Sequence, residues 1–179
     1  MKILEKIPQV KEIAPVYAVS VAILYTWALL HFFWRLPSWM LFSSMSDLTV
    51  IFFYMVTINF LESILLLFPP LVLSVVLPRK WFYDKFISRG ISLIISILLF
   101  FIFLNNRIQA DSPFPLELVR LRSLPFILMV IVAFAFLMDQ IGFLRKILME
   151  LADRLVVFLY ISIPVSIVAL LVVLLRNIF

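Results

Sequence analysis

The sequence contains no cysteine, only one histidine and only two glycines among 179 residues. Without cysteine there can be no disulfide, no thiolate metal site and no cysteine nucleophile. One histidine excludes an H-E-x-x-H zinc motif, and two glycines exclude the G-x-G-x-x-G dinucleotide fingerprint. Neither a P-loop nor a G-x-S-x-G nucleophile elbow occurs. We therefore expect no metal and no cofactor, and an enzyme ranks last among the three functional hypotheses below.

Charged residues are also scarce, because they make up 14% of the chain while apolar residues make up 65%. A soluble domain is typically about 25% charged and 45–50% apolar. The apolar runs are continuous and lack the alternation that a membrane β-barrel strand requires. We therefore predict an all-α, polytopic membrane helix bundle whose main partner is the lipid bilayer.

Five apolar runs are long enough to be membrane-spanning helices. The first ends in HFFWRLPSW, which has no small-residue cleavage site, so we expect an uncleaved helix rather than a signal peptide. The segment 1–14 is interpreted as a short amphipathic helix or a solvated tail, 105–123 as an interfacial connection, and 145–154 as a continuation of the fourth helix. The predicted spans, within a single transmembrane domain covering 1–179, are 15–34, 49–77, 86–104, 124–144 and 155–175.

Prolines give the expected ends and bends of these helices, because proline lacks a backbone N–H and restricts the residue before it. Pro37 is expected to end the first helix, and Pro69–Pro70 to kink the second. Pro164 is expected to break the fifth helix in its middle. Ser46 and Asp47 are suitable N-cap residues for the second helix.

The distribution of Lys and Arg predicts the orientation of the chain. With the N-terminus inside, ten of the 15 basic residues fall in inner segments and five in outer segments. We therefore expect the N-terminus inside and the C-terminus outside, with a prokaryotic cytoplasmic membrane as the default location. The basic and aromatic residues of 79–86 are interpreted as an interfacial belt, so we expect no nucleic-acid partner.

Glu62 is the only acidic or basic residue in the run 49–77 and lies near the middle of the predicted span. A carboxyl group at bilayer depth is costly, so it should face protein or water. At a similar depth we expect Asn59, Thr26 and Ser96, which together with Glu62 form a candidate intramembrane polar site. Two interpretations remain open: a proton- or cation-sensitive site, and a structural hydrogen bond within the bundle or to a partner subunit.

A second set of candidates lies near the predicted membrane surfaces. His31 and Arg35 are one helical turn apart, and Arg79 and Lys80 follow the second span. Each pair could bind a lipid headgroup or act only as an interfacial anchor. Asp139 is expected to reach the interface or to pair with Lys146.

The leading functional hypothesis is a structural or assembly subunit that packs against partner membrane chains or against copies of itself. It is favoured by the few chemical groups and by the stripe of Ser88, Ser92 and Ser96, whose small side chains suit close helix packing. The alternative is transport of an ion or small molecule through Glu62. A lipid-modifying membrane enzyme is a third possibility.

Overall fold

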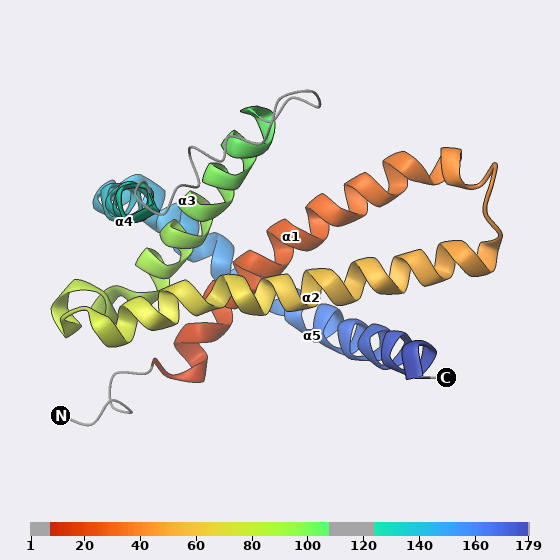
Figure 1. The fold of residues 1–179 in the computed structure, drawn as a ribbon. Helices are drawn as coiled ribbons and strands as arrows, with labels where there is room; N and C mark the ends of the chain where they lie inside the picture. The colour runs from red at the N-terminus through yellow and green to blue at the C-terminus, as the bar shows by residue number, and fades with distance from the viewer. Residues whose placement is uncertain (1–7, 108–123, 179) are drawn as a thin grey trace. The chain divides into compact units, whose positions relative to one another are not determined.

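The computed structural model describes residues 8–107 and 124–178, which contain five α-helices and two short 3-10 helices (Figure 1). The segment 1–7 and most of the expected connection, 108–123, lie outside the described residues. The elements in chain order are α1 (Val10–Trp39), α2 (Met45–Val76), η2 (Arg79–Trp81), η3 (Tyr83–Lys85), α3 (Phe86–Arg107), α4 (Leu124–Gln140) and α5 (Gly142–Ile178).

The all-α prediction with about five helices is confirmed, and the described residues contain no strand. Four of the helical segments are long and apolar enough to cross a membrane: those in α1, α2, α3 and α5. The fifth, α4, has 17 residues and a length of about 26 Å at ~1.5 Å per residue, slightly less than the ~30 Å hydrocarbon layer. The chain is therefore a membrane protein built from several apolar helices.

The expected effects of proline were wrong at two positions. Helix α1 continues through Pro37 to Trp39, and α5 continues through Pro164. In a membrane helix, neighbouring groups and small local adjustments can satisfy the backbone groups that proline leaves free. The second helix also runs through Pro69–Pro70, where the chain passes from one of its two compact units to the other.

The boundary between the last two helices also differs from the prediction. Helix α4 ends at Gln140 and α5 begins at Gly142, so the amphipathic segment 145–154 opens the fifth helix rather than extending the fourth. The carbonyl of Ile141 accepts the N–H of Arg145 at 3.0 Å, which closes the first turn of α5. The apolar pattern alone did not mark this interruption.

Helix α2 begins one turn earlier than expected, because Ser44 rather than Ser46 or Asp47 caps it. The backbone N–H of Asp47 donates to Ser44 Oγ at 3.2 Å, while Asp47 Oδ2 accepts the Ser44 backbone N–H at 3.2 Å and its hydroxyl at 2.7 Å. This reciprocal arrangement is a capping box with aspartate at the third helical position. It ends the short connection between α1 and α2 that Figure 1 shows.

The first compact unit comprises Met1–Pro8 and Pro70–Glu150. Its described part contains α3 and α4, which pack together, with the end of α2, the 3-10 helices and the start of α5. The predicted serine stripe of α3 is buried, with Ser88, Ser92 and Ser96 each less than 5% exposed. Small side chains on this face let the neighbouring backbone approach closely, as expected in lipid.

The second compact unit comprises Gln9–Pro69 and Leu151–Phe179, and so contains α1, most of α2 and most of α5. From Leu159 to Val173 the buried residues of α5 recur every three or four positions, which is the spacing of one face of a helix. A hydrophobic core joins α5 to α1 and α2 within this unit. The core residues are Ala18, Val21, Tyr25, Val56, Leu159 and Ala169.

Candidate functional site

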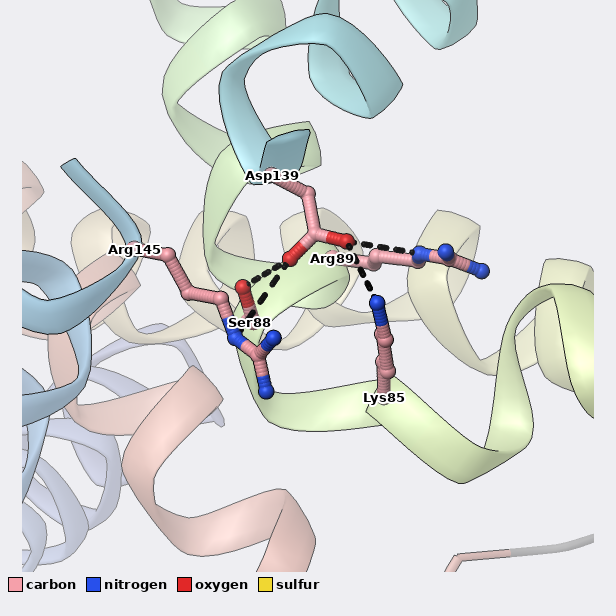
Figure 2. A network of polar contacts seen from close by, with 5 residues as sticks. All are labelled: Lys85, Ser88, Arg89, Asp139 and Arg145. Carbon is pink, nitrogen blue, oxygen red and sulfur yellow. Dashed lines mark hydrogen bonds and ion pairs between the residues drawn. The ribbon is translucent and has the colours of Figure 1, made fainter. Parts of the chain in front are cut away.

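The most extensive polar network in the described structure centres on Asp139, near the C-terminal end of α4 (Figure 2). Its side chain is only 2% exposed. Arg89 Nε donates to Asp139 Oδ2 at 3.0 Å, and the Ser88 hydroxyl donates to Asp139 Oδ1. Lys85 Nζ and Arg145 Nε each lie 4.0 Å from a carboxylate oxygen. Four elements, η3, α3, α4 and α5, thus converge on one carboxylate.

Each of these groups lies where a helix ends or begins. Together they meet at one end of the α3–α4 pair. Lys85 ends η3, Ser88 and Arg89 lie in the first turn of α3, and Arg145 lies in the first turn of α5. Since α3 and α4 pack together, the start of one can lie beside the end of the other. The polar groups therefore occupy the boundary of the apolar segments rather than their middle.

The charges in this network do not balance, because three cations surround one carboxylate. Arg89 makes the closest ion pair, and its side chain is 14% exposed, against 42% for Lys85 and 39% for Arg145. The pairs at 4.0 Å exceed ordinary hydrogen-bond distance, so they contribute long-range attraction rather than directed bonds. Lys85 and Arg145 therefore keep donors for other acceptors.

Arg89 is held in place by more than its carboxylate partner. Its Cζ atom lies 4.7 Å from the centroid of the Phe136 ring, within the range of a cation–π contact. One guanidinium nitrogen, Nη1, is buried and has no hydrogen-bond partner among the described residues. An unsatisfied buried donor on a cation is costly, and this one lies in a part of the chain already rich in positive charge.

The sequence identified Asp139 but not its main partners. Its predicted partner, Lys146, is exposed, and the observed partners are Ser88, Arg89 and, more distantly, Lys85 and Arg145. Ser88 and Arg89 are about 50 residues away along the chain, and no local spacing relates them to Asp139. The one sequence feature that could have indicated these partners is that α3 begins and α4 ends with polar residues.

Glu62 lies on an exposed face of α2. Within the described residues no hydrogen bond or ion pair joins its side chain to another residue. Its neighbours on the same face are apolar and at least half exposed. We call this set the Glu62 face: Ile58, Leu61, Glu62, Leu65 and Phe68.

The three residues predicted to accompany Glu62 make other contacts or lie exposed. Asn59 is buried and donates to the Met55 carbonyl at 2.8 Å, while Thr26 is exposed. Ser96 belongs to the first unit, and its hydroxyl donates to the Ser92 carbonyl at 2.7 Å. The joint site of these four residues stays a prediction.

Tyrosine and serine side chains form the internal polar contacts of the second unit, which sequence reasoning missed. The Tyr25 hydroxyl lies 2.5 Å from Ser166 Oγ, which donates to the Ser162 carbonyl. The Tyr17 hydroxyl lies 3.1 Å from Ser63 Oγ. These contacts join α1 to α5 and α1 to α2 at buried or half-buried positions.

The predicted headgroup residues are all exposed, as an interfacial role requires. His31 Nδ1 lies 3.0 Å from the Trp27 carbonyl oxygen, and its ring lies against that of Trp27 with 4.5 Å between centroids. In the first unit, Arg79 lies over the Tyr83 ring at 4.7 Å. Lipid binding at Arg35, Lys80 and these residues remains a prediction.

No protein-family model, curated protein or solved structure matches this chain. Among the described residues, no group of three or more His, Cys, Asp or Glu side chains could hold a metal ion. Function must therefore be inferred from the chain's own residues, of which Glu62 and the Asp139 network are the most informative.

Proposed function

We propose that this chain is a structural or assembly subunit of a membrane complex and that the Glu62 face contacts a membrane-spanning helix of another chain. The observation that carries the proposal is the exposed carboxyl of Glu62 in the middle of an apolar helix. The contacting helix belongs to a partner subunit or to a second copy of this chain, and it offers a polar group at the depth of Glu62.

The physical basis is the cost of leaving Glu62 in lipid. Translocon-based scales put an acidic residue at the centre of a membrane helix at roughly 2.5–3.5 kcal/mol. Polar side chains in membranes reduce such costs by hydrogen bonding across helices, with model-peptide values of about 1–2 kcal/mol. A second helix that hydrogen-bonds Glu62 would therefore lower the cost of this carboxyl in lipid and would be held in a defined position by it.

The apolar part of the Glu62 face has the geometry of a helix-packing seam. Ile58, Leu61, Leu65 and Phe68 are spaced by three, four and three residues, so they form one stripe along α2. This spacing is typical of left-handed helix pairs, which are common in membrane bundles. Glu62 is adjacent to the stripe, where it could hydrogen-bond across the interface without displacing the apolar contacts.

The proposal is tested by the mass of the protein–detergent particle and the identity of the chains that copurify. The wild-type protein and Glu62→Gln are expected to keep a defined oligomer or hetero-complex, because an amide can still hydrogen-bond. Glu62→Leu should dissociate it. Tyr160→Leu is the matched control, since it also replaces an exposed polar side chain of the second unit by leucine. A monomeric wild-type particle without partners would contradict the proposal.

Transport through Glu62 is the alternative function and depends on the same residue. A flux assay in liposomes distinguishes transport from assembly. Assembly predicts that Glu62→Gln leaves flux at the level of empty liposomes, as for the wild type. A wild-type flux that Glu62→Gln alters, with the particle mass unchanged, would favour transport instead.

A further inference from the structure

We propose that Lys85, Arg89 and Arg145, which we call the basic cluster, bind a phosphate oxyanion, and that Asp139 positions their side chains for it. In a membrane the natural source of this group is the headgroup of an anionic phospholipid, and free phosphate has the same chemistry. The proposal concerns the first unit and does not depend on the function proposed for Glu62.

The basic cluster carries an excess of positive charge. One carboxylate faces three cations, so a net charge of two remains at a site whose central acid is 2% exposed. Only Arg89 makes a close ion pair, while the other two stay 4.0 Å away. A bound phosphate would offset this excess and accept charge-assisted hydrogen bonds, which are shorter and stronger than neutral ones.

The buried Nη1 atom of Arg89 also indicates a ligand, because it has no acceptor in the part of the chain that the structure describes. Arg89 is already oriented by Asp139 through Nε and by the Phe136 ring, so its guanidinium is fixed before any ligand arrives. A planar guanidinium matches phosphate oxygens well. The unsatisfied donor therefore marks the point at which we expect an oxygen of the ligand.

The position of the basic cluster along the chain also favours a headgroup ligand. It lies where α4 ends and where α3 and α5 begin, beside Trp81 and Tyr83 in sequence. Aromatic and basic residues mark the headgroup layer of a membrane. Arg145 also stands in the first turn of α5, where the helix dipole disfavours a cation and favours an anion.

Lipid retention by the full chain, measured by native mass spectrometry from detergent, tests this proposal. The probes are phosphatidylglycerol, phosphatidylcholine and inorganic phosphate, added separately and in competition. The test variant is Lys85→Gln with Arg145→Gln, which removes two partly exposed cations and keeps the Asp139–Arg89 pair. The matched control is Lys11→Gln with Lys146→Gln, which removes two exposed cations to which no headgroup role has been assigned.

We expect retention of phosphatidylglycerol over phosphatidylcholine, a loss of affinity of roughly tenfold or more in the test variant, and little change in the control. Competition by inorganic phosphate at similar concentrations would identify a site for free phosphate, whereas resistance to it would identify a lipid site. Equal losses in both variants would show a diffuse charge effect and overturn the proposal, as would the absence of any selective binding.

A conservative variant shows whether a loss of lipid retention comes from the lost side chain or from a folding defect. Arg145→Lys keeps the charge but loses the planar fork of donors, so it should retain phosphatidylglycerol better than Arg145→Gln and less well than the wild type. Thermal unfolding in the same detergent must give similar midpoints for these two variants. Identical lipid retention in both variants and the wild type would contradict a role for Arg145.

Discussion

Asp139 is the residue on which the polar contacts of the first unit depend. We expect Asp139→Ala to lower the free energy of unfolding by about 3–5 kcal/mol, because Arg89 would stay largely buried without its carboxylate. Denaturant titration of the purified protein in mixed micelles measures the change. Asp84→Asn, at an exposed acid of the same unit, is the control and should have a small effect. A similar loss in both variants would contradict the central role of Asp139.

A second prediction at the residue scale concerns the contact between α1 and α5. Tyr25→Phe removes a hydroxyl that lies 2.5 Å from Ser166 Oγ and 3.4 Å from the Val56 carbonyl oxygen. We expect a loss of about 0.5–1.5 kcal/mol. The double variant with Ser166→Ala should lose less than the sum of the single changes. Strict additivity would mean that the two hydroxyls do not interact, and Tyr160→Phe, at an exposed site, is the control.

The candidate residues could be named from the sequence more readily than their contacts. Glu62 and Asp139 are conspicuous because acids are rare in apolar runs. Their surroundings depend on the rotation of each helix and on contacts between segments far apart in the chain. Thus Asp139 pairs with Arg89 rather than with Lys146, and the Tyr25–Ser166 contact spans 141 positions. Local spacing carries little information on such pairs.

At the scale of the elements, the buried face of α5 holds the second unit together. Ala169 is fully buried in its core, whereas its neighbour Val168 is 54% exposed. We expect Ala169→Leu to destabilise the protein by about 1–3 kcal/mol through overpacking, while Val168→Leu should be nearly neutral. Unfolding midpoints in the same detergent measure both. Equal midpoints for the two variants would contradict this packing face.

The helices themselves were predictable because long apolar runs leave few alternatives in a membrane. The errors came from local rules derived from soluble helices. Pro37 and Pro164 were expected to end or break helices that continue through them. The interruption at Ile141 lies in a region without proline, so its sequence gave little warning that 145–154 belongs to α5.

At the scale of the whole molecule, the contacts of the second unit bear on the path of the chain through the membrane. The Tyr54 hydroxyl donates to Asn177 Oδ1 at 3.0 Å, so the end of α5 lies at the end of the unit where α2 begins. Helix α5 therefore runs parallel to α1. Because α2 runs against both α1 and α5, the chain must cross the membrane an even number of times between α2 and α5. Two crossings, one by α3 and one by the short α4, would satisfy this requirement.

This path predicts that the two ends of the second unit lie on opposite sides of the membrane. The distribution of Lys and Arg predicts that the N-terminal end is inside. Lys11→Cys and Arg176→Cys introduce single thiols at exposed positions of a chain that has no cysteine. A membrane-impermeant maleimide added to intact cells should label Arg176→Cys and reach Lys11→Cys only after lysis. Labelling of both from the same side would contradict the parallel course of α1 and α5.

The most direct test of the central proposal is site-specific cross-linking from the Glu62 face in the native membrane. A thiol-reactive photo-cross-linker is attached at Leu65→Cys, or at Val157→Cys as a control of similar exposure in the same unit. We expect a discrete protein adduct from Leu65→Cys, either a dimer of this chain or one defined partner, that is absent at Val157→Cys and lost when Glu62→Leu is added. Lack of an adduct at Leu65→Cys, or the same adducts from both positions, would contradict it.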